Sequence, residues 1–413
     1  MTKPILSAEG LNVGYGKKTV VSGLNLKAMK GQVICLLGPN GAGKTTVLRT
    51  LSGLLAPVSG TVEVEGVGIG SLKQKELSRR LSLVLTESVT PSLTTVEELV
   101  SMGRTPYTGL MGRLTDEDRR IVAEAIETVG AGSLRERYYD ELSDGEKQKV
   151  MIARALVQEP RLMILDEPTS HLDVRHKIEV IRVLQRLSGE KGITCILSLH
   201  DIDLALKGCQ IVLLVRDGKI AAQGTPEEIV GNGCIGELYD ISGARYSELL
   251  GAVELTGKDS DEIFVAGGAG SGVRLYRALS RSGYGLTAGV LHRGDVDFQI
   301  AEPICSRVIA EEPFEPVSRE NADKAFALIR AAKCVADSGF PIGSGNLENA
   351  ALLKRTAESG KPVLSLRDPK EGARLYGVAN GGVIYCGGIG RLLSEAERIV
   401  KGNGGSDAEN CTK

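Results

Sequence analysis

The chain has 413 residues, well above the ~100–200 of one typical domain, so at least two hydrophobic cores are expected. Lys plus Arg (50) nearly balance Asp plus Glu (52), which excludes the strongly basic character of most nucleic-acid-binding proteins. The longest apolar runs, such as residues 211–215, are far shorter than the ~18 residues of a membrane-spanning helix, and the N-terminus has no apolar signal core. Eight cysteines without any CxxC pair are expected to be reduced thiols and not zinc ligands.

The first half of the chain predicts a mixed α/β domain. Residues 4–35 alternate apolar and polar positions, which favours short antiparallel strands, and the apolar strand 33–37 runs into a glycine-rich loop. From about 90 to 140 the apolar spacing becomes helical, so we expect a helical insertion there. Strands alternate with helices in the rest of this half, which predicts a largely parallel sheet; the strands are expected at 162–165, 194–199 and 211–215.

The second half predicts a separate α/β domain of Rossmann-like type. A glycine-rich, polar stretch at 231–260 marks the boundary, so we assign residues 1–250 to the first domain and 261–401 to the second. Residues 402–413 are polar and are expected to form a flexible tail. Strands are expected at 262–266, 286–291, 306–310, 362–366 and 382–386, and helices at 273–282, 320–330, 347–359 and 391–401.

A phosphate-binding loop is predicted between the strand 33–37 and the helix that follows it. The sequence matches GxxxxGK[ST], in which backbone N–H groups and a helix N-terminus surround the phosphates of a nucleotide. Lys44 is expected to reach the β- and γ-phosphates and Thr45 to bind Mg²⁺. The complete set of predicted nucleotide-binding residues in this loop is Gly38, Pro39, Asn40, Gly41, Ala42, Gly43, Lys44, Thr45 and Thr46.

An acidic pair closes the apolar strand 162–165. Asp166 and Glu167 lie where the edge of an α/β sheet usually meets its ligand. Asp166 would hold the Mg²⁺ shell, and Glu167 would orient or deprotonate the attacking water. Alone, such a pair is as often a helix N-cap. Because the chain also carries a phosphate-binding loop, we favour the catalytic interpretation.

A third segment resembles the signature sequence of ABC ATPases, which is normally LSGGQ followed by a basic residue and Gln. The segment keeps four of those residues and changes two, and it reads Leu142, Ser143, Asp144, Gly145, Glu146, Lys147 and Gln148. The resemblance implies that Ser143, Asp144, Gly145 and Glu146 act on the γ-phosphate held by a second subunit, so hydrolysis requires a dimer. Ser143 also suits the N-cap of the following helix, and both interpretations can hold together.

Further residues fit the same family. The resemblance implies that Tyr15 stacks on adenine, that Asp173 belongs to the D-loop, and that His200 contacts the γ-phosphate and is catalytic together with Glu167 and Lys44. One family feature is missing, because no Gln follows the strand at 81–85. Thr86 or Glu87 is assigned its metal-sensing role only as the nearest substitute.

The resemblance covers about residues 1–245 and implies the ATP-hydrolysing subunit of an ABC transporter, with ATP and Mg²⁺ as cofactors. Residues 95–107 are similar to the subfamily that imports iron–siderophores, haem and cobalamin, and the C-terminal extension looks most like archaeal cobalamin import ATPases. The implied location is the cytoplasmic face of the membrane, as a peripheral protein. The implied partners are membrane permease subunits, a second copy of the chain and, indirectly, a periplasmic or extracellular substrate-binding protein, with no nucleic acid.

Two alternatives remain open at this level. The substrate could be an iron–siderophore or haem in place of cobalamin, since permease and binding protein select it. A non-transport ABC ATPase acting on DNA or ribosomes is the other alternative, although such proteins usually carry a long coiled coil or two nucleotide domains, and this sequence has a single phosphate-binding loop.

The second domain shows two glycine-rich turns but no catalytic triad, paired acids or metal cluster. Residues 267–272 lie between a predicted strand and a predicted helix, where a phosphate-binding turn would lie, although the spacing departs from GxGxxG. Residues 343–346 form a second such turn. A tight turn without ligand is the favoured interpretation, and a crevice for a small anionic or nucleotide-like ligand is the alternative if both turns share one sheet edge. A regulatory role is expected.

Overall fold

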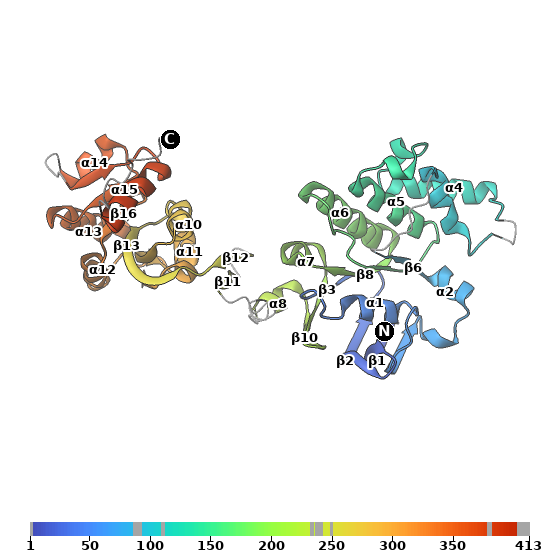
Figure 1. The fold of residues 1–413 in the computed structure, drawn as a ribbon. Helices are drawn as coiled ribbons and strands as arrows, with labels where there is room; N and C mark the ends of the chain where they lie inside the picture. Colours follow the sequence, from blue (N-terminus) through green and yellow to red (C-terminus); the bar gives the residue numbers. More distant parts are fainter. Residues whose placement is uncertain are drawn as a thin grey trace, which may run out of the picture. The chain divides into compact units, whose positions relative to one another are not determined.

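The computed structural model describes residues 3–85, 93–108, 112–231, 235, 243–247, 251–377 and 382–402. The chain divides into two compact units, residues 1–240 and 241–413 (Figure 1). Within the described ranges, no helix is both long enough and apolar enough to cross a membrane.

The first unit is built on one ten-stranded mixed sheet. Its strands are β1 (Leu6–Tyr15), β2 (Lys18–Ala28), β3 (Val33–Leu37), β4 (Ser59–Val64), β5 (Val67–Gly68), β6 (Leu81–Val84), β7 (Leu162–Leu165), β8 (Thr194–Leu199), β9 (Ile211–Arg216) and β10 (Lys219–Gly224). They follow the order β5-β4-β1-β2-β10-β9-β3-β8-β7-β6. β1, β2 and β4 pair in antiparallel fashion, whereas β9, β3, β8, β7 and β6 are parallel. The predicted mixed sheet is thereby confirmed.

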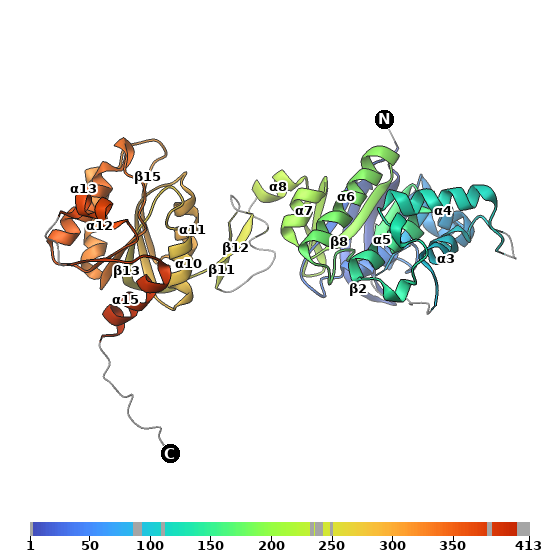
Figure 2. The ribbon, with the colours of Figure 1, turned by 90° about the horizontal axis from the view of Figure 1, so that it is seen from above.

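Three of the parallel strands, β3, β7 and β8, are short, mostly apolar and buried over their whole length. This is expected for strands that are covered on both faces of the sheet. The helices of this unit are α1 (Lys44–Leu51), α2 (Gln74–Arg80), α3 (Val96–Ser101), α4 (Asp116–Thr128), α5 (Asp144–Leu156), α6 (Val174–Lys191), α7 (Ile202–Gly208) and α8 (Pro226–Gly231). Figure 1 shows β1 and β2 on one side of α1, and the predicted helical insertion forms α3 and α4, which pack beside α5 (labelled in Figure 2). The carboxyl ends of β3, β7 and β8 therefore meet at one edge of the sheet.

The second unit contains a parallel six-stranded sheet, which is preceded in the chain by a two-stranded hairpin. The hairpin strands are β11 (Ala244–Ser247) and β12 (Ala252–Leu255), and the sheet strands are β13 (Lys258–Ala266), β14 (Gly285–His292), β15 (Arg307–Glu311), β16 (Cys334–Asp337), β17 (Val363–Ser365) and β18 (Val383–Tyr385). The order β15-β14-β13-β16-β17-β18 is 3-2-1-4-5-6 when counted from the first sheet strand. This is the strand order of Rossmann folds, whose ligands bind between the first and fourth strands.

Helices cover both faces of this sheet (Figure 2). They are α10 (Val273–Arg281), α11 (Val296–Ile304), α12 (Arg319–Ala331), α13 (Leu347–Glu358), α14 (Pro369–Tyr376) and α15 (Ile389–Lys401). One core contains buried residues of α10, α11 and α15, and the other contains buried residues of α12, α13 and α14. The Rossmann-like fold predicted from the sequence is confirmed, but α11, α14 and the central strand β16 were missing from the prediction.

The second unit also begins earlier than the predicted residue 261. The hairpin belongs to it, because Glu254 in β12 is only 6% exposed and its carboxylate pairs with Arg277 of α10. Gly257, between hairpin and sheet, packs so closely on α11 that a Cβ there would clash with the carbonyl oxygen of Ile304. A cut near residue 257 would therefore divide a packed unit.

Candidate active site

The predicted phosphate-binding loop joins β3 to α1. Gly41 and Gly43 have φ angles of 79° and 100°, in the left-handed region that favours glycine. A Cβ on Gly38 would lie 2.3 Å from the carbonyl oxygen of Val215, so no larger residue fits there. α1 begins at Lys44 with no acidic residue in its first turn and no side-chain cap. The N-terminal N–H groups of α1 are thus suited to receive an anion.

Lys44 is the positive group of this loop and is only 4% exposed. Its Nζ donates hydrogen bonds to the carbonyl oxygens of Gly38 (2.8 Å) and Pro39 (3.0 Å). Burial lowers the pKa of Lys44, and the nearby carboxylates of Glu167 and Asp166 oppose that shift. A phosphate oxygen is a stronger acceptor for an ammonium group than either carbonyl, so the loop can exchange these bonds for a nucleotide.

The acidic pair follows β7 and meets the loop. Thr45 Oγ1 donates to Asp166 Oδ1 at 3.2 Å, which joins residues that are 121 positions apart. Hydroxyl and carboxylate oxygens suit Mg²⁺, which proteins usually hold with one or two such groups plus substrate phosphates. Thr45 and Asp166 therefore fit a Mg²⁺ site. Across the part of the chain that the structure describes, no group of three or more His, Cys, Asp or Glu side chains gathers as a closed metal site.

Glu167 and His200 lie in direct contact. His200 Nε2 and Glu167 Oε1 are 2.5 Å apart, and Ser170 Oγ donates to Glu167 Oε2 at 2.8 Å. Burial pushes the pKa of Glu167 upward, but the hydrogen bonds from Ser170 and His200 outweigh it and hold that pKa below its usual value. Both side chains line a cavity of about 640 Å³ that also reaches Asn40 of the loop. A carboxylate that stays ionised beside the phosphate-binding loop can orient a water molecule.

The sequence analysis did not single out Ser198, although it interrupts the apolar run that follows Thr194 in β8. It is fully buried and bonds to both Asp166 and the backbone of Glu167. A polar side chain inside a buried strand needs a hydrogen-bond partner. Because the acidic pair was predicted at the end of another strand of the same sheet, the sequence could have indicated Ser198 as its partner.

The signature residues form the N-terminus of α5. Ser143 caps the helix, and Glu146 Oε2 accepts hydrogen bonds from Ser143 N (2.9 Å) and Oγ (2.8 Å), which confirms the N-cap interpretation. A Cβ on Gly145 would lie 2.3 Å from the ring of His176, whose Nδ1 is 2.9 Å from Asp173 Oδ1. Asp173, the residue predicted for the D-loop, therefore holds the ring of His176 against Gly145 of the predicted signature.

Two of the remaining predicted residues lie at the surface of this unit, whereas Thr46 is buried in α1. Asp144 is exposed, and Tyr15 at the end of β1 is 53% exposed, which leaves its ring accessible for stacking. Thr86 and Glu87, proposed from the sequence as substitutes for the metal-sensing Gln, lie outside the described residues.

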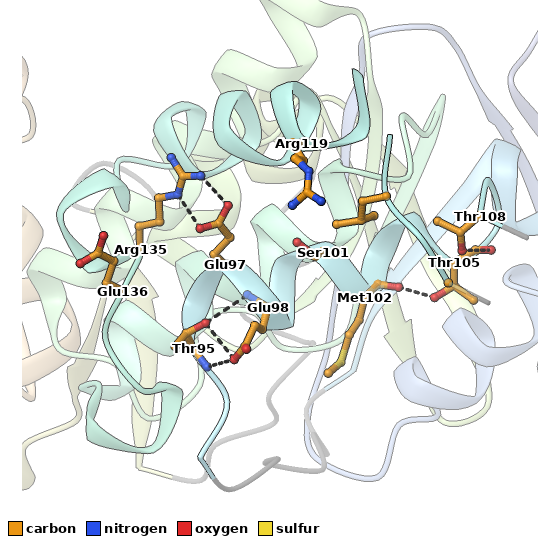
Figure 3. Close-up of a pocket in the computed structure, with 12 residues that line it drawn as sticks. Thr95, Glu97, Glu98, Ser101, Met102, Thr105, Thr108, Arg119, Arg135 and Glu136 are labelled. Carbon is orange, nitrogen blue, oxygen red and sulfur yellow. Dashed lines mark hydrogen bonds and ion pairs between the residues drawn. The ribbon is translucent and has the colours of Figure 1, made fainter. Parts of the chain in front are cut away.

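A polar groove of about 760 Å³ lies on the helical insertion. Figure 3 shows its lining side chains, which come from α3 and its N-cap, from the first turn of α4 and from the segments that follow these two helices. Arg135 pairs with Glu97, and Glu98 bonds to Thr95. Met102 is 49% exposed and adds an apolar group to this lining.

A buried arginine lies in the segment that lines this groove, between Met102 and Thr105. Arg104 is 4% exposed, and its guanidinium binds Asp118 (2.8 Å), the carbonyl oxygen of Val157 (2.7 Å) and Glu159 (2.8 Å). It also stacks on Tyr107, 4.0 Å from the ring centroid. Because Val157 is the C-cap of α5, Arg104 ties the groove to the helix that carries the signature.

Two carboxylates of the second unit occupy the backbone N–H groups of its glycine-rich turn. It follows β13, and the turn at 343–346 follows the neighbouring parallel strand β16, so both lie at the carboxyl edge of the sheet. Asp297 Oδ2 accepts from the N–H groups of Gly268 (2.6 Å) and Gly272 (3.0 Å), and Asp295 Oδ2 accepts from Ala269 N (2.6 Å). These donors are the ones that a phosphate would need. The favoured interpretation of a turn without phosphate agrees with this geometry.

Comparison with known proteins places these sites in context. A family model described as ABC transporter matches residues 21–170, and one described as MJ0874 family matches residues 286–393. The uncharacterized ABC transporter ATP-binding protein MJ0873 of Methanocaldococcus jannaschii is 44% identical over 289 residues, which cover 70% of this chain and 100% of that protein.

Two further relatives and one solved structure align with different lengths of this chain. The ferric enterobactin transport ATP-binding protein FepC of Escherichia coli is 40% identical over 236 residues, 57% of this chain and 87% of that protein. The cobalamin import ATP-binding protein BtuD of Halobacterium salinarum is 31% identical over 340 residues, 80% of this chain and 85% of that protein. The structure of cbiO1 from Clostridium perfringens, part of the ABC transporter complex cbiONQ, is similar with a TM-score of 0.51 and 30% identity, over 57% of this chain and 94% of that one.

Proposed function

The chain belongs to the ATP-binding proteins of ABC transporters, and we propose that it energises import of cobalamin or a related corrinoid. It is an ATPase, the ATP-binding subunit of an importer for substrates of the iron–siderophore and cobalamin type. The alignment with the halobacterial cobalamin protein carries the finer proposal, because its 340 residues must extend beyond the first unit of residues 1–240, whereas the enterobactin relative aligns over 236. An iron–siderophore is the second candidate, since the enterobactin relative is 40% identical and the cobalamin relative 31%.

ATP binding would use the loop between β3 and α1. The N–H groups at the start of α1 and the ammonium group of Lys44 meet the phosphates, and the exposed ring of Tyr15 offers a stacking surface for adenine. Thr45 and Asp166 would hold Mg²⁺, which neutralises charge on the phosphates when bound.

Hydrolysis would be driven by positioning and by charge. The ionised carboxylate of Glu167 orients a water molecule toward the γ-phosphorus and accepts its proton as the new P–O bond forms and the bond to ADP breaks. His200, in contact with Glu167 Oε1, fixes the carboxylate and adds a hydrogen-bonding group toward the γ-phosphate.

The active form would be a dimer of this chain with its permease. Ser143 caps α5 and, with Gly145, presents a helix N-terminus that suits the γ-phosphate bound by the other copy. In that arrangement Asp144 and Glu146 add negative charge near the phosphate, which weakens closure relative to a signature with Gly and Gln.

The groove on the helical insertion is the proposed contact with the permease. Its lining of charged and polar side chains around Met102 suits a short polar segment of a membrane protein, and Arg104 links the lining segment from Met102 to Thr105 to the predicted signature helix. The chain would then lie at the cytoplasmic face of the membrane as a peripheral protein. The substrate-binding protein would act on it only through the permease, and no nucleic acid takes part.

The test of substrate is uptake in cells that lack this chain. Labelled cobalamin and a labelled ferric siderophore are supplied to cells complemented with the wild-type chain or with Lys44→Ala. We expect cobalamin uptake to be lost without the chain and restored by the wild type alone. Loss of only the iron compound would assign the chain to siderophore import instead.

A further inference from the structure

Ser198 joins the two acidic residues of the active site through one hydroxyl group. Its side chain is fully buried in β8, next to β7, at whose end the acidic pair lies. Ser198 Oγ accepts a hydrogen bond from the backbone N–H of Glu167 at 2.8 Å and donates one to Asp166 Oδ1 at 2.8 Å. Because an amide N–H can only donate, the hydroxyl proton must point to the carboxylate, and the direction of both bonds is fixed.

The bond to Glu167 holds an unfavourable backbone conformation. Glu167 has φ of 49°, in the left-handed region that residues with a Cβ rarely adopt. Such a conformation persists only where surrounding groups hold it, and the Ser198 hydroxyl is a direct partner of this residue's amide. The same conformation brings the Glu167 carboxylate to His200 and Ser170.

The bond to Asp166 extends this arrangement to the phosphate-binding loop. Asp166 Oδ1 accepts from Ser198 and also from Thr45 Oγ1 at 3.2 Å. Hydrogen bonds therefore run from β8 through Asp166 to the first turn of α1. A rotation of the Asp166 carboxylate would move the oxygens that the Mg²⁺ site needs.

We propose that Ser198 is a positioning residue for ATP hydrolysis, which sets the orientation of the Asp166 carboxylate and the backbone of Glu167 together. The proposal rests on the proposed roles of these two acids. It predicts an effect on the chemical step and on the Mg²⁺ requirement, because nucleotide binding depends mainly on the separate loop around Lys44. A hydroxyl that merely filled space would affect stability without changing either quantity.

The experiment measures steady-state ATPase activity of the full chain as a function of ATP and of Mg²⁺. Ser198→Ala should lower kcat about 10- to 100-fold, the usual effect of removing a group that orients a metal ligand, and should raise the Mg²⁺ concentration for half-maximal rate. KM for ATP should stay near the wild-type value. Ser198→Thr keeps the hydroxyl and should restore most of kcat, whereas Ser198→Cys keeps the volume but bonds weakly and should not.

The matched control is Ser82→Ala. Ser82 is 1% exposed in β6 of the same sheet, and its hydroxyl has no hydrogen-bond partner among the described residues, so its removal should leave kcat unchanged. Melting temperatures of all variants show which are folded, and Ser198→Cys gives the answer if Ser198→Ala does not fold. Wild-type kcat and Mg²⁺ dependence in a folded Ser198→Ala or Ser198→Cys chain would overturn the proposal. Glu167→Gln is measured alongside: if it too hydrolyses ATP normally, the assigned role of Glu167 fails, whereas an inactive Glu167→Gln beside a fully active Ser198→Ala refutes Ser198 alone.

Discussion

Replacing Arg367 with Met tests how the second unit is held together and whether it is independent of the ATPase unit. Arg367 and Asp337 form an ion pair with side-chain exposures of 1% and 0%. The guanidinium also binds Glu371 (2.9 Å) and the carbonyl oxygen of Phe340 (2.7 Å). Since β16 ends at Asp337 and α14 contains Glu371, Arg367 ties together the carboxyl edge of the sheet.

The expected loss in unfolding free energy depends on how Asp337 is compensated once Arg367 is removed. Removing one member of a buried ion pair costs about 3–5 kcal/mol, because the remaining charge is no longer compensated. Asp337 Oδ2 keeps hydrogen bonds from the hydroxyl groups of Ser365 (2.8 Å) and Tyr376 (2.7 Å), so we expect the lower end, about 3 kcal/mol. With a urea dependence of about 2 kcal/mol/M, the unfolding midpoint of this unit should fall by about 1.5 M.

The assay is urea unfolding of the full chain, with hydrogen exchange of α12 and α13 reporting on the second unit and ATPase activity reporting on the first. Arg398→Met is the control, because Arg398 is 60% exposed in its pair with Glu395 and its loss should cost at most about 1 kcal/mol. Adding Asp337→Asn to Arg367→Met should recover part of the loss, since the uncompensated charge is gone. Equal midpoints for Arg367→Met and Arg398→Met would refute the reasoning.

Four further predictions concern both units. Lys44→Ala should weaken ATP binding, measured by calorimetry, because a charge on the phosphates is lost; unchanged affinity would contradict the assignment of the loop. Glu167→Gln should lower hydrolysis about 100-fold or more while ATP still binds and drives dimerisation, seen by size exclusion, and Glu9→Gln, exposed on β1, is its control. A chain that ends after residue 240 should retain ATPase activity, because every described site residue precedes that point; loss of activity in a folded truncation would make the second unit part of the catalytic dimer. Hydrogen bonds from Ser318 lower the pKa of Glu311 to about 2. The stabilisation that Glu311 gives the second unit is therefore complete above the ordinary pKa of 4.5 and is lost as the pH falls toward 2. Glu311→Gln should flatten the acid dependence of this unit's stability, and an unchanged stability profile would count against the prediction.

The local motifs of the ATPase unit could be predicted from the sequence because neighbouring residues fix their conformation. The turn Gly41 to Gly43, the N-cap at Ser143 and the acids after β7 each depend on backbone preferences within a few positions. Their order along the chain sufficed to predict the family and the α/β fold, and both are confirmed. The catalytic roles of Glu167 and His200 and the action of the signature in a dimer stay predictions.

Other features were decided by tertiary structure, because they join residues that are far apart in the chain. Four residues ending in an aspartate gave too weak a pattern to predict β16, yet β16 completes the strand order of the second sheet between β13 and β17. Asp295 and Asp297, at the N-terminus of α11 and more than twenty positions away, occupy the N–H groups of the glycine turn, so this candidate phosphate site is filled by the chain's own carboxylates. Ser198 reaches Asp166 across 32 positions, through the pairing of β7 with β8. A local sequence fixes which groups are present and how the backbone turns beside them, but packing of the sheet selects which distant group satisfies each hydrogen bond.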